Sequence, residues 1–392
     1  MEGRLPAHPG KRGMCMAEAR ALRVAVVGCG KIAAAHAGAY VRDGRARLAA
    51  AVDPAAEAAA DFARRFGVPR TYPDHRAMLD AERPDVVSVC AWPPDHPAPV
   101  VDAAAAGARG ILCEKPLAVT LPEADRMLAA AERAGAVFMV GHQRRLEARY
   151  RLARDLIASG ALGEVVDVHG TCGGDLLTDG THLFDLARFL LADPPAAHVF
   201  AGIDVTLPER MAPTGFGTLH YNATHRRYGH RIEGGAAGHV QFAPPDGARA
   251  GPRFRFETGS MARPFGYQHF RVEGTQGRLA VSGDPADGER AWLRVQRRGG
   301  GPGGAWEDVP LPPCDPLAAE VGALIDSVLA GAPTPDAALL AAGSARADLE
   351  LVLAALDSAV RRRLIGLPAS LTDHPLERLD AGETRSQGGT AP

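Results

Sequence analysis

Apolar positions in the first third of the chain form short, nearly continuous runs that are separated by amphipathic, alanine-rich segments. The runs predict strands at residues 22–28, 48–53, 86–91, 110–114 and 136–141. The segments between them predict helices at residues 31–42, 54–66, 95–107 and 120–134. Strands that are apolar throughout are typical of sheets covered on both faces, and their alternation with helices indicates a parallel, doubly wound α/β sheet.

After residue 141, glycine and proline break the chain into shorter stretches. Strands are predicted at residues 164–172, 198–206, 236–243, 252–258, 268–274, 277–282 and 290–297. Helices are predicted at residues 145–159, 178–191, 315–330 and 335–362. A run of strands after a helical segment indicates an α+β domain with a large, mostly antiparallel open sheet.

These patterns divide the chain into four parts. We expect a disordered leader at residues 1–20, an α/β domain at 21–142, an α+β domain at 143–366 and a flexible tail at 367–392. The first twenty residues contain no apolar run of signal-peptide length, and no stretch of the sequence is long enough to predict a membrane span.

Composition excludes several classes of function. The chain has 392 residues, of which 46% are hydrophobic and 23% charged, as in ordinary soluble proteins. A net charge of −2 gives no electrostatic basis for binding nucleic acid or an anionic membrane. The six cysteines form no CxxC pair and the histidines show no metal-ligand spacing. We therefore expect a cytoplasmic protein with reduced thiols and no metal site.

A glycine motif, Gly28-Cys29-Gly30-Lys31-Ile32-Ala33, follows the first predicted strand and opens the first helix. The first glycine permits a tight turn, and the second lets a pyrophosphate approach the helix N-terminus. Asp53 ends the next strand, 25 residues after Gly28. Its carboxylate could bond a ribose diol and would repel a 2′-phosphate, which favours NAD over NADP. The alternative is that Asp53 only caps the following helix.

Lys115 is one of only three lysines among 44 basic residues; the others are Lys11 and Lys31. Coding bias can explain the scarcity of lysine, but Lys115 lies in Glu114-Lys115-Pro116, just past the fifth predicted strand. Ligands of open α/β sheets bind beyond the carboxyl ends of the strands. An ammonium at that edge could hold a substrate oxygen and stabilise the negative charge that develops on it.

A third motif spans residues 173–186 and contains Asp179, His182 and Asp185 at intervals of three. On a helix these three side chains share a face. Oxidation of an alcohol needs a proton acceptor, and histidine titrates in the useful range. The alternative is that His182 is a packed core histidine with surface aspartates beside it.

Five motifs together resemble the glucose–fructose oxidoreductase/inositol 2-dehydrogenase family over about residues 22–365. They are GCGKIA with His36 three positions later, Trp92–His96, Glu114–Pro116, Gly141–Arg145 and Gly173–Leu186. The resemblance implies an N-terminal NAD(P)-binding Rossmann domain and a second domain whose open sheet commonly forms oligomer contacts, as a homodimer or homotetramer. It also implies hydride transfer between a nicotinamide and a sugar, cyclitol or related polyol.

The resemblance also assigns roles to residues. It implies that Lys115 holds the reacting oxygen and that His182 exchanges its proton, with Asp179 as a third catalytic candidate. The expected cofactor contacts are Gly28, Cys29, Gly30, Lys31, Ile32, Asp53, Ala91, Trp92, Pro93, His96, Glu114, Lys115 and Gln143. The expected substrate contacts are Lys115, Arg144, Thr178, Asp179, His182 and Tyr267.

The chain departs from the family pattern at one position. Members similar to inositol dehydrogenase have an aspartate four residues before the histidine, where this chain has Thr178. The acid is Asp179, one residue later, which rotates it by about 100° on a helix. Either Asp179 orients His182 or Thr178 contacts the substrate.

Two weaker candidates and two other functions stay open. Tyr228-Gly229-His230 and Tyr267-Gln268-His269 each precede a strand and could line a sugar pocket, although loop packing is the favoured interpretation. The chain could also be an NAD-binding sensor without turnover. A third possibility is a glycoside-cleaving enzyme that uses tightly held NAD as a transient oxidant.

Overall fold

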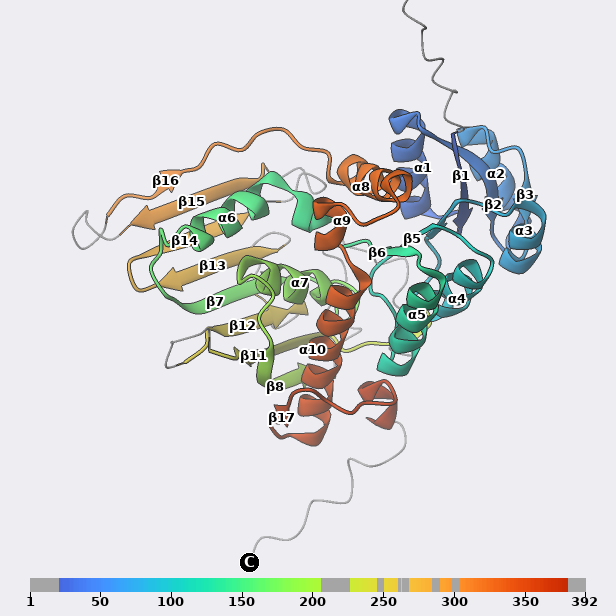
Figure 1. Cartoon of the computed structure of the whole chain (residues 1–392). Coiled ribbons are helices and arrows are strands. Elements are labelled where there is room, and N and C mark those ends of the chain that lie inside the picture. The colour runs from blue at the N-terminus through green and yellow to red at the C-terminus, as the bar shows by residue number, and fades with distance from the viewer. Residues whose placement is uncertain are drawn as a thin grey trace, which may run out of the picture.

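A six-stranded parallel sheet forms the centre of the first domain in the computed structural model (Figure 1). The structure describes residues 21–205, 226–244, 250–259, 262, 268–283, 290–297 and 304–379. In the order β3-β2-β1-β4-β5-β6, the strands are Thr71–Tyr72, Ala46–Val52, Leu22–Val27, Val86–Val89, Gly110–Cys113 and Val137–Val140. The strand order reverses between β1 and β4, so the predicted doubly wound α/β fold is confirmed.

Five helices connect these strands within the described part of the domain. They are α1 Lys31–Asp43, α2 Ala56–Phe66, α3 His75–Glu82, α4 Pro97–Ala105 and α5 Leu121–Ala134. The sequence patterns did not predict β3 or α3. A two-residue strand and an eight-residue helix are too short to show a clear hydrophobic period.

A nine-stranded sheet dominates the second domain in its described residues, in the order β16-β15-β14-β13-β7-β12-β11-β8-β17. Its longer strands are β7 Val165–Cys172, β8 Ala196–Asp204, β11 Gly235–Phe242, β12 Arg253–Thr258, β13 His269–Gly274, β14 Gly277–Ser282 and β15 Trp292–Arg297. Its short edge strands are β16 Glu307–Asp308 and β17 Ile365–Gly366. Among the described strands of this sheet, only β7 and β12 pair in parallel, so the prediction of a mostly antiparallel sheet is confirmed.

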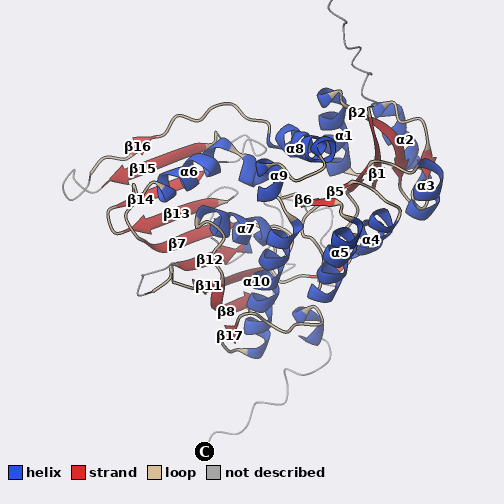
Figure 2. Ribbon diagram, viewed as in Figure 1, coloured by secondary structure: helices blue, strands red, loops and turns tan. Residues whose placement is uncertain are grey.

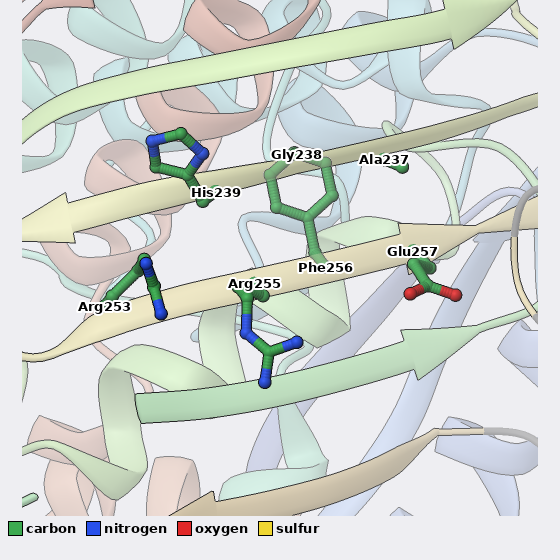
Figure 3. Close-up of a pocket in the computed structure, with 7 residues that line it drawn as sticks. All are labelled: Ala237, Gly238, His239, Arg253, Arg255, Phe256 and Glu257. Atoms are coloured by element: carbon green, nitrogen blue, oxygen red, sulfur yellow. The ribbon is translucent and has the colours of Figure 1, made fainter. Parts of the chain in front are cut away.

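Helices cover one face of this large sheet (Figure 2). They are α6 Ala148–Ala158, α7 Gly180–Leu190 and α10 Ala342–Arg361. On β12, Phe254 and Phe256 point into this core, while Arg253 and Arg255 are exposed on the opposite face. That outer face has a shallow hollow (Figure 3), lined by Ala237, Gly238, His239, Arg253, Arg255, Phe256 and Glu257.

The last quarter of the chain returns to the first domain, which a boundary at residue 142 did not anticipate. Helix α8, Pro316–Ala330, packs beside α1 against β5 (Figure 1). A Cβ on Gly110 of β5 would lie 2.6 Å from Val328, so α8 approaches the sheet closely because residue 110 is a glycine. The face of the first sheet that carries α1 is therefore completed by α8.

The single helix expected at residues 335–362 is two helices, α9 Pro335–Leu339 and α10. Between them the chain turns extended at Ala341, which bridges to Met139 of β6. The N–H of Val140 donates to the carbonyl of Leu340 at 2.9 Å. Pairing with the sheet thus interrupts a sequence whose helical pattern is continuous.

The flexible tail was expected from residue 367, but residues 367–379 are packed against the second domain. Leu371, His374 and Leu376 are buried, and a 3₁₀ helix spans Pro375–Leu379. The Ala369 N–H donates to Glu350 of α10 at 2.6 Å. Within the described ranges, no helix combines the length and the apolar character needed to cross a bilayer.

Candidate functional site

The glycine motif forms a tight turn between β1 and α1. Gly28 has φ +89°, and a Cβ there would lie 2.7 Å from the backbone of Cys90. Gly30 is the N-cap of α1, and no side-chain bond caps this helix end. A Cβ on Gly30 would meet nothing within 4 Å among the described atoms. The turn therefore leaves space in front of helix N–H groups, as an approaching pyrophosphate requires.

Asp53 stabilises this turn and also bonds the backbone just before α2. Its Oδ2 accepts a hydrogen bond from the Cys29 N–H at 2.9 Å, and its Oδ1 accepts one from the Ala55 N–H at 2.8 Å. The side chain lies at the carboxyl end of β2, directly beside the glycine turn. A purely capping role does not account for its bond to Cys29.

Glu114 is held behind the catalytic lysine candidate by His36 of α1. His36 Nε2 lies 3.0 Å from Glu114 Oε1, and its Nδ1 lies 2.9 Å from the Ser88 hydroxyl. The Lys115 N–H donates to Glu114 Oε2 at 3.2 Å. A Cβ on Gly141 would lie 2.9 Å from this carboxylate, so the glycine makes room for it. Both His36 and Glu114 are buried.

The loop after β4 contacts the loop that carries Lys115. His96 is buried, with Nδ1 3.0 Å from the Pro116 carbonyl and Nε2 3.0 Å from the Ala91 carbonyl. Burial lowers the pKa of His96. Pro93 is buried, whereas Trp92 is 51% exposed and its ring lies 5.8 Å from that of Tyr228 in the second domain. His96 thus acts structurally, by joining two loops at the same sheet edge.

Lys115 projects from the carboxyl end of β5 toward the second domain. Its peptide bond to Pro116 is cis. Its Nζ donates a hydrogen bond to the main-chain carbonyl of Thr178 at 2.9 Å. Thr178 is buried just before α7, so the first turn of α7 and the lysine lie together.

His182 lies in the first turn of α7, buried to 3% exposure. Its Nδ1 is buried and none of the described residues bonds it. Burial, and then the positive charges of Lys115 and Arg144, hold the pKa of His182 well below its ordinary value. The ring of His142 packs edge-on against it, with 5.6 Å between centroids. The result is a neutral imidazole beside an ammonium.

Asp179 is bound by an arginine of the second domain. Its Oδ2 accepts from Arg227 Nη1 at 2.5 Å, and the same nitrogen donates to Asp175 Oδ2 at 2.8 Å. The main-chain carbonyl of Asp179 accepts the His182 N–H at 3.2 Å. The carboxylate therefore anchors Arg227 at the start of α7.

Behind the two histidines lies a buried ion-pair network. Arg145 Nε donates to Asp185 Oδ1 at 2.6 Å, and Arg188 Nη1 donates to Asp348 Oδ1 at 2.5 Å. His142, Asp185 and Asp348 bring possible ligand atoms within 4.8 Å of one another. Because guanidinium groups already pair with both carboxylates, we interpret this cluster as structural.

The remaining expected contacts divide into two groups. Gln143 and Arg144 begin a 3₁₀ helix, Gln143–Leu146, directly after β6, and Arg144 lowers the pKa of His182. Tyr267 lies outside the described residues. Sequence reasoning did not select Arg227 or His142 as site residues. His142 lies within the Gly141–Arg145 motif but was given no role of its own, whereas Arg227 belongs to no motif and only the fold brings it here.

The comparisons with known proteins agree with this geometry. Residues 22–142 match the family model described as oxidoreductase family, NAD-binding Rossmann fold. A myo-inositol 2-dehydrogenase of Thermotoga maritima is 26% identical over 208 residues, which cover 50% of this chain and 62% of the relative. A D-apiose dehydrogenase of Paraburkholderia graminis is 33% identical over 188 residues, which cover 43% of this chain and 49% of the relative.

Over residues 22–142 the chain is similar to this oxidoreductase family with an NAD-binding Rossmann fold. The matched region spans about half to three-fifths of the length of these curated relatives. A levoglucosan dehydrogenase solved with NADH and levoglucosan shares the fold over 89% of this chain and 100% of its own, with a TM-score of 0.72 and 21% identity.

The match to this family model identifies the first domain as an NAD-binding domain. The residues fit that cofactor, because Gly28 makes the turn, Gly30 leaves space at the start of α1 and Asp53 stands where a ribose diol would lie. Lys115 lies just after the carboxyl end of β5, and its side chain contacts the second domain.

Proposed function

We propose that this protein is an NAD-dependent oxidoreductase that transfers hydride between nicotinamide and a hydroxyl or keto carbon of a sugar, cyclitol or sugar derivative. The observation that carries the proposal is the pair formed by Lys115 and His182. The two side chains come from different domains. Lys115 Nζ bonds the carbonyl of Thr178, four residues before His182, and burial followed by the charge of Lys115 lowers the pKa of His182. Both inositol and apiose dehydrogenases among the relatives are named for such substrates.

Lys115 would hold the reacting oxygen. An ammonium has three N–H donors, and one of them is committed to the Thr178 carbonyl. The direction of the remaining two is thereby restricted. They could hydrogen-bond the substrate oxygen and stabilise the negative charge it gains during the reaction. Bound NAD would supply the hydride acceptor or donor.

His182 would exchange the proton of that oxygen. Its depressed pKa keeps the imidazole neutral through the physiological range, so it can accept a proton without first losing one. Its buried Nδ1 has no bond to a described residue. A positioned base of this kind typically contributes about 10²–10⁴-fold.

The other expected residues would act around this pair. We propose that Asp179 orients His182 indirectly, by holding Arg227 and the start of α7. Arg144 would contact the substrate or lower the pKa of His182 through its charge. Thr178 would position Lys115 through its carbonyl. Asp53 would select NAD through the ribose.

The test is to follow reduced-cofactor absorbance with NAD and with NADP across free sugars, cyclitols, sugar phosphates and nucleotide sugars. Turnover with NAD on one of these classes is expected. Lys115→Ala and His182→Ala should each lower kcat/KM by at least 100-fold, while Arg64→Ala, an exposed substitution in the last turn of α2, should not. Normal turnover by both site variants would contradict the assignment.

The same preparation distinguishes the two other functions. Stoichiometric NAD that survives purification, together with glycoside cleavage and no net reduction, would indicate an enzyme that recycles its cofactor. NAD binding without turnover on any substrate would indicate a sensor.

A further inference from the structure

Thr178 is held at three points, and each bond involves a different part of the residue. Its N–H donates to Asp175 Oδ1 at 2.7 Å, and its carbonyl accepts from Lys115 Nζ at 2.9 Å. Its hydroxyl lies 3.2 Å from His230 Nε2. Thr178, Asp175 and His230 are all buried, with 4%, 0% and 3% exposure. The position of the carbonyl that receives Lys115 is therefore fixed from two sides.

His230 reaches Thr178 because it lies on a two-residue hairpin. Strands β9 Arg226–Arg227 and β10 His230–Arg231 pair antiparallel, with Arg227 directly opposite His230. Between them Tyr228 and Gly229 have φ +47° and +85°, as a type I′ turn requires. Directly opposed residues project to the same face of a hairpin. Both side chains accordingly contact the segment before α7.

Arg227 docks the hairpin on this segment. Its Nη1 bridges Asp175 and Asp179, the two carboxylates that flank Thr178 in sequence. The guanidinium is 9% exposed, so water screens these charge-assisted bonds little. Arg227 fixes where the hairpin sits, which leaves His230 opposite the Thr178 hydroxyl.

The tip of the hairpin contacts the first domain. The ring of Tyr228 lies 5.8 Å from that of Trp92, and a Cβ on Gly229 would lie 3.4 Å from Pro94. Trp92 and Pro94 belong to the loop after β4, at the sheet edge that carries Lys115. The hairpin therefore contacts both the loop after β4 in the first domain and the segment before α7 that contains Thr178.

We propose that His230 is a positioning residue for Lys115, acting through Thr178, and that the hairpin at residues 226–231 assembles this part of the site. His230 holds the Thr178 hydroxyl, and so keeps the carbonyl of the same residue directed at the ammonium. One N–H of Lys115 is thereby anchored to the Thr178 carbonyl, which restricts the directions of the other two N–H groups. The role in turnover rests on the proposed function, but the effect on Lys115 does not.

The sequence makes Lys115 directly observable. The chain has three lysines, so protein labelled with ¹³C at lysine Cε gives at most three side-chain signals, from Lys11, Lys31 and Lys115. Loss of one signal in Lys115→Arg assigns it. Its chemical shift then reports the surroundings of the ammonium in the full-length protein, without substrate or cofactor.

Three variants of histidine separate positioning from packing. His230→Leu removes the bond to Thr178, whereas His230→Gln places an amide where Nε2 lies and retains it. His75→Leu makes the same chemical change on α3, where His75 pairs with Asp102 at 2.8 Å. We expect His230→Leu to shift the Lys115 signal and leave that of Lys31 in place, and the other two variants to keep both signals.

Thr178→Val supplies the second route to the same test, since it deletes the hydroxyl and keeps the carbonyl. It should move the Lys115 signal as His230→Leu does, and the double variant should move it no further. On an active substrate, His230→Leu should lower kcat by roughly tenfold with an unchanged KM for NAD, because a slightly misplaced group lowers rate rather than cofactor binding.

The proposal is overturned if the Lys115 signal of folded His230→Leu coincides with the wild type, or if His230→Gln shifts it equally. Thermal unfolding followed by circular dichroism establishes that each variant is folded. If His230→Leu does not fold, an unshifted Lys115 signal in Thr178→Val is the contradicting result. Absence of sugar turnover in the wild type would refute the proposed function, and the lysine signals would still decide the role of His230.

Discussion

At the scale of single residues, two buried histidines of this site differ because their neighbours differ. Burial opposes a charge on His36, but contacts with Cys90 and Glu114 outweigh it and raise its pKa well above the ordinary value. His182 is equally buried and faces Lys115 and Arg144, so its pKa is lowered. The environment thus favours the charged form of one imidazole, beside Glu114, and the neutral form of the other, beside Lys115.

Asp53 provides a prediction about cofactor choice. Asp53→Asn keeps an oxygen that can accept one of the Cys29 and Ala55 N–H groups, and removes the negative charge. Because that charge would repel a 2′-phosphate, the ratio of the NADP to the NAD dissociation constant should fall by about tenfold or more. Fluorescence titration with both cofactors measures it. An unchanged ratio would show that Asp53 serves the turn alone.

The site residues that could be predicted from the sequence are those that belong to a short local motif. Gly28, Asp53 and Lys115 each lie at the carboxyl end of a predicted strand, so the fold rule for strand ends placed them together. Tyr228-Gly229-His230 was predicted only as a segment that could line a sugar pocket, with loop packing favoured, and Arg227 was not selected. Their contacts with Asp175, Thr178 and Asp179 span about fifty residues and depend on a hairpin too short to predict.

At the scale of elements, the C-terminal segment at residues 367–379 is held by apolar burial and includes an unusual histidine. His374 is 5% exposed and neither ring nitrogen has a partner among the described residues. Burial, followed by the nearby His230, lowers its pKa to about 3. Docking of this segment should therefore depend on pH.

The sign of this dependence follows from the depressed pKa. The unfolded chain binds a proton below pH 6.5 that folded His374 does not accept, so its contribution to stability is present above pH 6.5 and declines as the pH falls toward 3. His374→Leu should reduce the loss of unfolding free energy between pH 7 and pH 5 by about 2 kcal/mol. Urea unfolding at both values measures this difference, and an identical loss in the variant would contradict it.

The contact between α8 and β5 gives a second prediction for elements. Gly110→Ala should destabilise the protein by about 1–3 kcal/mol, because the added methyl group would overlap Val328. Combining it with Val328→Ala should recover part of the loss, since the smaller side chain makes room. Thermal unfolding of both single variants and the double variant measures the coupling. Simple additivity would mean that the two residues do not touch.

At the scale of the whole molecule, the order of the layers was predicted better than the pairing of distant segments. Hydrophobic period distinguishes a parallel from an antiparallel domain, and both assignments are confirmed. The hydrophobic period does not predict that α8 covers the first sheet or that β7 pairs with β12. Such contacts depend on how the chain connects distant segments and not on the local sequence pattern.

The outer face of the nine-stranded sheet yields a prediction about assembly. Phe200 of β8 is 44% exposed there, with the ring of His239 6.2 Å away. We expect this face to pair with a second copy, since a broad sheet face with apolar side chains is stabilised by being covered. Phe200→Glu should lower the molar mass measured by light scattering, and Arg42→Glu on exposed α1 should not. A monomeric wild type would contradict the expectation.

The return of α8 to the first domain has a consequence for synthesis on the ribosome. When residue 142 has been made, one face of the first sheet still lacks α8, which begins at Pro316. About 190 further residues must be translated before Leu324 and Val328 can cover that face, on the order of ten to forty seconds at ordinary rates. The nascent first domain would expose apolar surface for that time, so we expect it to bind chaperones and to be unstable when excised at residue 142.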